Sequence, residues 1–147
     1  MFLALMVALG FTAAGVMRAY GAGEDPTRNP GFYPAAYVQM QNPVSLAPES
    51  VERGRALFFQ HCARCHGEGG RGDGVEAGRF YPRPKDFTHA KDLQHKTDGQ
   101  VFYSITRGIP GTAMPAHEES LGRDERWHLV NFIRSLAPAF KGQAAKP

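Results

Sequence analysis

The stretch HCARCHGEGGRGDG, residues 61–74, contains three overlapping motifs, and the choice among them decides the fold. Cys62 and Cys65 form a Cys-x-x-Cys pair, which is typical of a redox dithiol or of half a zinc site. His66 extends this pair to Cys-x-x-Cys-His. The glycine-rich run at 67–72 matches the GxGxxG pattern found in nucleotide-binding loops.

Cysteine count and context disfavour the zinc, dithiol and nucleotide interpretations. The chain has 2 cysteines, whereas structural zinc sites need four ligands and iron–sulfur clusters normally need four cysteines. His89 and His95 are the nearest second pair of zinc ligands, and their spacing fits a zinc finger poorly. A nucleotide fold and a thioredoxin-type dithiol both require a strand before the motif. No stretch of this chain has sustained period-two alternation, so we expect no bound nucleotide.

Apolar spacing predicts three main helices, at residues 49–61, 97–107 and 123–136. Pro48 precedes the first helix, and the second opens with a capping box from Thr97 to Gln100 and stops at Gly108. The third has acidic residues in its first turn, and Pro138 lies just beyond its end. The sequence therefore predicts an all-α domain with long irregular connections, which a bound cofactor would help to pack.

The Cys-x-x-Cys-His motif meets the demands of covalent haem attachment. Two thiols two residues apart reach the two vinyl groups of one porphyrin, and His66 then supplies its imidazole to the iron. A soft thioether is a suitable second axial ligand, and Met114 lies in RGIPGTAMPAH between stiffening prolines. His117 is the rival ligand, and we expect His89, His95 and His128 to lie on the surface or on a helix face. The glycines after His66 are expected to form a flexible exit from the site.

Charge and composition separate the remaining partner classes. Lys and Arg number 17 against 14 Asp and Glu, giving a net charge of +3 without a long run of one sign. Nucleic-acid binding needs a concentrated basic stripe, so we expect no nucleic-acid partner. A mild positive excess suits docking to an acidic protein surface.

The N-terminal third of the chain divides into two segments. Residues 1–21 form a signal peptide or an N-terminal membrane anchor, because residues 2–17 are uncharged and mostly apolar. A helix of that length rises about 24 Å, which is short for a membrane core of about 30 Å. Either alternative exports the remaining chain, to the periplasm or the outer face of the cytoplasmic membrane. Residues 22–47 are rich in Pro and Gly and predict a linker or arm. A plain tether is the commoner outcome for such a segment, and packing of the aromatics Phe32, Tyr33 and Tyr37 on the domain or on a partner is the alternative.

Over residues 48–138 the chain resembles a class I c-type cytochrome, with 139–147 left as a C-terminal tail. The resemblance rests on the Cys-x-x-Cys-His motif after a helix, on the sequence around Met114 and on an aromatic C-terminal helix. It implies a cytochrome c-like fold around one haem c, attached to Cys62 and Cys65 and ligated by His66 and Met114. It also implies a close crossing of the terminal helices, for which Gly54, Phe58 and Phe132 match the family pattern.

Several further residues are candidates for contacts around the haem. Family members commonly use a proline carbonyl to accept the proximal histidine's Nδ1–H, and Pro82 and Pro84 are the candidates here. Candidate contacts to the haem propionates are Tyr81, Arg83, Lys85 and Tyr103, of which we expect at least half to be exposed on the surface instead. Lys85, Lys91, Lys96 and Arg107 are candidates for a basic ring around the haem edge.

The sequence thus predicts a mono-haem electron carrier, not an enzyme, that works between redox partners in a respiratory or other electron-transport chain. The segment from GDG to GIPGTAMP looks most like the cytochromes that are subunits or partners of bacterial respiratory complexes. Two alternatives stay open. One is a haem enzyme or gas sensor with an open sixth position, and the other is a fixed cytochrome subunit of a membrane-bound oxidoreductase complex.

Overall fold

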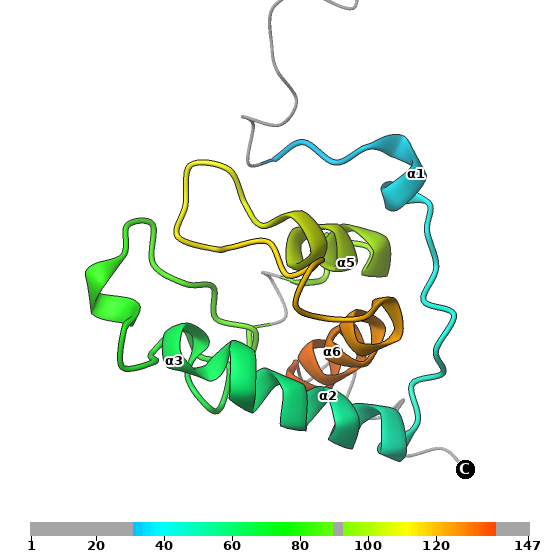
Figure 1. Cartoon of the computed structure of the whole chain (residues 1–147), viewed down its shortest axis with the longest axis horizontal. Coiled ribbons are helices and arrows are strands. Elements are labelled where there is room, and N and C mark those ends of the chain that lie inside the picture. Colours follow the sequence, from blue (N-terminus) through cyan, green and yellow to red (C-terminus); the bar gives the residue numbers. More distant parts are fainter. Residues whose placement is uncertain (1–30, 90–92, 138–147) are drawn as a thin grey trace, which may run out of the picture.

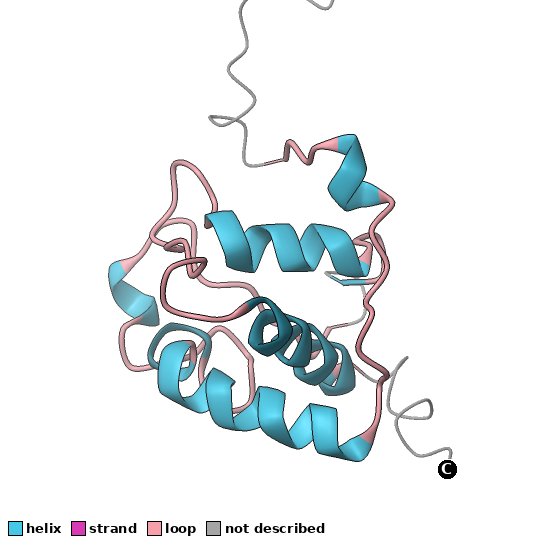
Figure 2. Cartoon of the chain, turned by 45° about the vertical axis from the view of Figure 1, so that its right-hand side comes forward, coloured by secondary structure: helices cyan, strands magenta, loops and turns pink. Residues whose placement is uncertain are grey.

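The computed structural model describes residues 31–89 and 93–137 of the 147-residue chain, and within these ranges it contains helices and loops but no strand (Figures 1 and 2). Three helices of ten or more residues form the body: α2 (Pro48–His61), α5 (Asp98–Arg107) and α6 (Arg123–Leu136). Shorter turns are α1 (Ala35–Val38), α3 (Ala63–His66) and the 3₁₀ turn η2 (Ala77–Arg79). The all-α fold and its three main helices are confirmed. The predicted N-terminal segment and C-terminal tail lie outside the described residues.

The helix ends follow the local signals in the sequence. Pro48 occupies the first turn of α2, where its missing N–H costs no hydrogen bond. Thr97 caps α5 by accepting from Gln100 N at 3.2 Å, and the Gln100 side chain accepts from Thr97 N at 2.8 Å. This is the predicted capping box, and α5 ends at Arg107, directly before Gly108 with its φ of 71°.

The core is built where α2 crosses α6 (Figure 1). A Cβ built on Gly54 would lie 2.0 Å from the carbonyl oxygen of His128 and 2.8 Å from Phe132 Cβ, so only glycine permits this approach. Phe58, with no exposed surface, packs on Phe132 with ring centroids 5.1 Å apart. The crossing implied by the family resemblance is therefore present.

α5 packs on α6 from the other side, and the aromatic contacts continue into the N-terminal segment. Phe102 of α5 stacks on the buried Trp127 of α6 at 3.9 Å. Tyr37 of α1 stacks on Phe102 at 6.4 Å and meets Tyr103 edge-on at 4.7 Å. Aromatic side chains therefore join α1, α5 and α6 in one continuous core.

Residues 31–47, which we call the arm, run along the ends of α5 and α6 (Figure 1). The Asn42 side chain donates to Asn131 Oδ1 at 2.7 Å, and Asn131 donates to the Val44 and Ser45 carbonyls at 3.2 and 3.0 Å. Because Asn131 is buried, these bonds satisfy polar groups that water cannot reach. The arm is thus packed on the domain through both aromatic and amide side chains.

Candidate functional site

One cavity of about 400 Å³ opens between the segment that carries α3 and the loop that follows α5. It is lined by the two cysteines, His66, Met114 and His117 together with a largely apolar set. The apolar residues are Phe58, Phe80, Phe87, Leu93, Val101, Ile105, Ile109, Leu129 and Ile133. A pocket of this size and composition is suited to a large apolar ligand that is fixed by a few polar groups.

Cys62 and Cys65 lie on one side of this cavity, because α2 ends at His61 and α3 begins at Ala63. Cys62 N still donates to Phe58 O at 2.8 Å, and α3 then adds a single turn that carries Cys65 and His66. The thiols are not joined to each other. Burial, and next the neighbouring Cys65, raises the pKa of Cys62 to about 12, and burial also raises the pKa of Cys65. A reactive dithiol needs a lowered thiol pKa, so the raised pKa values of both thiols disfavour redox-dithiol chemistry.

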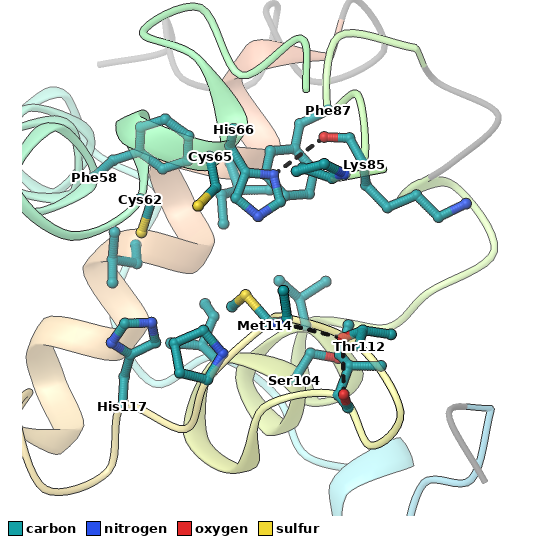
Figure 3. A pocket seen from close by; sticks show the side chains of 18 of the residues that line it. Phe58, Cys62, Cys65, His66, Lys85, Phe87, Ser104, Thr112, Met114 and His117 are labelled. Carbon is teal, nitrogen blue, oxygen red and sulfur yellow. Dashed lines mark hydrogen bonds between the residues drawn. The ribbon is translucent and has the colours of Figure 1, made fainter. Parts of the chain in front are cut away.

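The His66 ring is fixed by one hydrogen bond and one aromatic contact. Its Nδ1 lies 3.2 Å from Lys85 O, and the ring stacks on Phe87 at 4.6 Å and 22° (Figure 3). A carbonyl only accepts, so Nδ1 carries the proton and Nε2 keeps its lone pair. Burial lowers the pKa of His66, and the hydrogen bond to Lys85 opposes this shift. The lowered pKa favours the neutral imidazole, which is the form that binds a metal. The prediction that Pro82 or Pro84 supplies the acceptor is wrong, because the carbonyl that reaches the His66 ring is that of Lys85, the residue after Pro84.

Met114 lies across the cavity from His66, on the loop after α5 (Figure 3). Thr112 fixes this loop, since its Oγ1 donates to Ile109 O at 2.8 Å and accepts from Met114 N at 3.2 Å. Met114 O in turn accepts from Ile109 N at 3.2 Å. The thioether is thus presented by a short closed turn.

His117, the rival ligand, also lines the cavity but sits nearer to Cys62 than to His66 in Figure 3. Its ring lies 6.3 Å from that of His61. Burial, and then the nearby His61, lowers the pKa of His117, so a neutral imidazole is favoured there too. The side chain that lies across the cavity from His66 is nevertheless Met114 (Figure 3).

The remaining histidines lie where the sequence predicts. His89 and His95 are exposed, and His89 pairs with Asp86. His128 lies on the face of α6, with its Nδ1 2.8 Å from Ser50 Oγ.

The glycine-rich stretch after His66 is tightly folded and is not the loose exit that we expected. Gly72 N donates to His66 O at 2.8 Å, and a Cβ on Gly72 would lie 2.3 Å from the Pro84 carbonyl oxygen. Gly72 has φ of 72°, which other residues rarely adopt. Its packing holds the loop before Lys85 against the back of the His66 turn.

Some of the residues predicted to contact the haem propionates or to surround the haem edge lie at the rim of the cavity, and others do not. Arg83, Lys85 and Lys96 line it, whereas Tyr81 does not and is 97% exposed. Tyr103 packs against Tyr33 and Tyr37 instead of facing the cavity, so its expected role is wrong. Arg107 pairs with Glu118 outside the lining, and Lys91 lies outside the described residues.

The sequence prediction missed Tyr33 and Ser104, which also line this rim. Tyr33 Oη lies 3.3 Å from Ser104 Oγ, although 71 residues separate the two. No local pattern marks such a contact. The available signal was the group of aromatic residues in the arm, Phe32, Tyr33 and Tyr37, which does not say what each one contacts.

The donor set fits a covalently attached haem. Two thiols at one side, a neutral imidazole whose Nδ1–H is engaged, and a facing thioether are the groups that such a haem requires, and they meet in one apolar cavity. No cluster of three or more His, Cys, Asp or Glu side chains in residues 31–89 and 93–137 forms a separate metal site. The same residues contain no helix long and apolar enough to cross a membrane.

Comparison with known proteins agrees with this fit. The family model described as Cytochrome c matches residues 51–137. The chain is 26% identical over 72% of its length to the quinohemoprotein alcohol dehydrogenase ADH IIB of Pseudomonas putida, of which it covers 14%. It is 29% identical over 74% of its length to the cbb3-type cytochrome c oxidase subunit CcoP of Azospirillum sp. (strain B510), of which it covers 38%.

Among solved structures, a chain of the Kuenenia stuttgartiensis reducing HAO-like protein complex Kustc0457/Kustc0458 is similar with a TM-score of 0.60 and 30% identity. The match covers 68% of this chain and 48% of that chain. The chain therefore spans less than half the length of each of these relatives. Since the family model covers more than half of the sequence, the chain belongs to the cytochrome c family and binds covalently attached haem c.

Proposed function

We propose that this cytochrome carries single electrons between redox partners, with Cys62 and Cys65 as the thioether links and His66 and Met114 as the axial ligands. The observation that carries the proposal is the placement of His66 and Met114 on opposite sides of one cavity that also receives both thiols (Figure 3). Haem c supplies the reversible one-electron ferrous–ferric couple. The protein's part is to hold two strong ligands in place and to exclude water.

The residues around the ligands suit electron transfer better than substrate chemistry. The Lys85 carbonyl fixes the His66 ring, and the Thr112 hydroxyl fixes the turn that presents Met114. Ligands that stay in place in both oxidation states keep the reorganisation small, and a thioether favours the ferrous state and raises the potential. Apolar neighbours such as Phe87 and Ile105 keep the site dry.

Docking to an acidic surface of the partner is the second part of the proposal. Arg83, Lys85 and Lys96 lie at the rim, and no Asp or Glu is among the described residues that line the cavity. Basic residues around a reactive edge attract an acidic partner and speed encounter at low salt. Transfer rates to an acidic partner protein should fall as ionic strength rises. Rates that do not depend on salt would contradict this part.

The first experiment tests covalent attachment. Intact-protein mass spectrometry and haem staining after denaturing electrophoresis should find one haem on the chain co-expressed with a cytochrome c maturation system. A Cys62→Ala/Cys65→Ala double variant should carry none. A wild-type chain without bound haem, or a double variant that keeps it through denaturation, would overturn the proposed site.

The alternative of a haem enzyme or gas sensor needs an open position opposite His66. Met114 occupies the wall at that position and is presented by the Thr112 turn. This placement favours the carrier. Rapid carbon monoxide binding by the ferrous protein would favour the sensor instead.

A fixed cytochrome subunit of a membrane-bound complex is a second candidate, favoured by the similarity to an oxidase subunit and to a chain of a multiprotein complex. The proposed location is the periplasm or the outer face of the cytoplasmic membrane, with residues 2–17 as a signal or an anchor. N-terminal sequencing of the mature protein separates the two. A chain that starts near residue 22 favours a free carrier, whereas an intact N-terminus in the membrane fraction favours the tethered subunit.

A further inference from the structure

The rim of the haem cavity carries positive charge from two directions. Arg83 and Lys85 come from the segment that positions His66, and Lys96 comes from the turn before α5. The described lining includes no Asp or Glu. Haem c has two propionate carboxylates, and a carboxylate that leaves bulk water needs a charged or hydrogen-bonding partner.

Lys96 belongs to a compact polar cluster with Tyr33 and Ser104. Lys96 Nζ donates to Tyr33 Oη at 2.5 Å and lies 4.4 Å from the centroid of the Tyr33 ring. Ser104 Oγ donates to Gln100 O at 3.1 Å, so Tyr33 is the donor in its 3.3 Å contact with Ser104. A lysine ammonium has three N–H donors, and Tyr33 uses one of them.

The protein fixes this cluster from both sides. The buried Arg134 of α6 donates to Asp98 Oδ1 at 2.7 Å, to Leu93 O at 2.8 Å and to Lys96 O at 2.5 Å. These bonds tie down the backbone that carries Lys96. Tyr33 is held by the edge of Tyr103 at 5.8 Å. The cluster is therefore organised without any ligand, as expected of a binding site.

The cluster also lies on the appropriate side of the cavity. In haem, the propionates are on the two pyrrole rings opposite those that carry the vinyl groups. Attachment to Cys62 and Cys65 would therefore place the propionate edge away from the cysteines. In Figure 3, Ser104 and Lys85 lie toward the end of the cavity that is away from Cys62.

We propose that Lys96 binds one haem propionate through the N–H groups that Tyr33 leaves unused, and that Tyr33 and Ser104 hold Lys96 in position, so that the arm is a working part of the haem site that sets its reduction potential. This inference rests on the proposed haem attachment. Tyr33 lies before the family match at 51–137, so the contact joins a residue outside the matched segment to two residues inside it. A propionate without a counter-charge favours the ferric state, and pairing with Lys96 removes that bias and raises the potential.

The test compares variants of the full holoprotein that change one atom group at a time. Lys96→Gln removes the charge, Tyr33→Phe removes only the hydroxyl, and Lys96→Arg keeps charge and donors. Tyr37→Phe is the matched control, because Tyr37 is on the same arm but packs on Phe102 and does not line the cavity. The readouts are the midpoint potential from a redox titration and the carboxylate bands of the redox-induced infrared difference spectrum.

Lys96→Gln should lower the midpoint potential and shift a haem carboxylate band. Tyr33→Phe should do both to a smaller extent, and Lys96→Arg and Tyr37→Phe should stay close to wild type. The inference is overturned if Lys96→Gln and Tyr33→Phe match Tyr37→Phe in both readouts, or if Lys96→Arg loses as much as Lys96→Gln. Every variant should also be stained for covalent haem. The proposed attachment to Cys62 and Cys65 predicts full staining in all of them, so a loss of staining would count against the proposed function, whereas unchanged potentials with full staining would count against this inference alone.

Discussion

His66 and Met114 face the same cavity, but the chain holds them by different means. On the His66 side, the ligand is on α3 and its ring is fixed by Phe87 and the Lys85 carbonyl. The loop behind it is closed by the bond from Gly72 N to His66 O. Its glycine is packed against backbone, so little space is left for movement.

On the Met114 side, the proposed ligand is on a loop whose base packs on Gly108, where a built Cβ would lie 2.6 Å from Met114 O, but whose tip has few supports. Thr112 and Ile109 make the local turn, and His117 N donates to Ile105 O at 3.1 Å where the loop rejoins the body. Gly111 in the middle of the loop has nothing within 4 Å of a built Cβ. The difference indicates that His66 is fixed by packing of both its ring and its loop, whereas the Met114 loop is packed only at its base and is otherwise held by a few hydrogen bonds. If Met114 ligates the iron as proposed, it is the axial ligand that we expect to be lost first.

The largest expected effect comes from exchanging one glycine for alanine on each side. Gly72 and Gly111 have nearly the same φ, 72° and 73°, so both variants incur the left-handed strain of about 1–2 kcal/mol. Only Gly72→Ala adds a Cβ 2.3 Å from the Pro84 carbonyl oxygen, and overpacking raises its total cost to about 3 kcal/mol or more. Guanidinium unfolding of the two holoproteins should therefore give a clearly larger loss for Gly72→Ala. Equal losses would mean that the His66 side is not the more tightly packed one.

Removal of one hydroxyl on each side should have an intermediate effect. Thr112→Val loses both bonds that shape the Met114 turn, at a cost of about 1 kcal/mol, so Met114 should leave the iron about fivefold more often. Thr88→Val is the control, since Thr88 Oγ1 donates to Asp86 on the His66 side. Imidazole binding to the ferric protein, followed by stopped flow, should accelerate in Thr112→Val alone. Equal acceleration in Thr88→Val would refute the local role of the Thr112 turn.

The smallest expected effect is a change in pH dependence on the Met114 side. Burial lowers the pKa of His117 in the folded state, whereas in the unfolded chain it is about 6.5. The unfolded state therefore binds more protons, and the stability linked to His117 is lost as the pH falls below about 6.5. His117→Gln should flatten the decline of the unfolding free energy between pH 7 and pH 5. His95→Gln, at an exposed position, should leave the wild-type slope, and parallel profiles for all three proteins would contradict the assignment.

The sequence was sufficient for features that are encoded locally. The capping box at Thr97 and the glycine at 108 place α5, and the spacing of Trp127, Val130 and Ile133 places α6. Periodicity and caps act within one helix, so they can be read without tertiary information. The attachment motif is also local, because one turn brings its three side chains together.

Long-range and backbone contacts were beyond the sequence. The acceptor for His66 is the carbonyl of Lys85, and every residue has a carbonyl, so side-chain identity gives no signal. Tyr33 reaches Lys96 and Ser104 only because the arm folds back along α5. Gly72 is a glycine because the Pro84 carbonyl packs closely against it, and this contact could not be predicted without knowing where Pro84 lies in the fold.

Axial ligation by His66 and Met114 is the central claim, and carbon monoxide binding tests it most directly. Optical spectra of the ferric and ferrous wild type should be recorded before and after exposure to carbon monoxide, beside those of Met114→Ala. The predicted result is a low-spin wild type with a methionine–iron charge-transfer band and no rapid binding. Met114→Ala should keep its covalent haem, lose the band and bind carbon monoxide at once. A wild type that lacks the band and binds as fast as Met114→Ala would contradict the account.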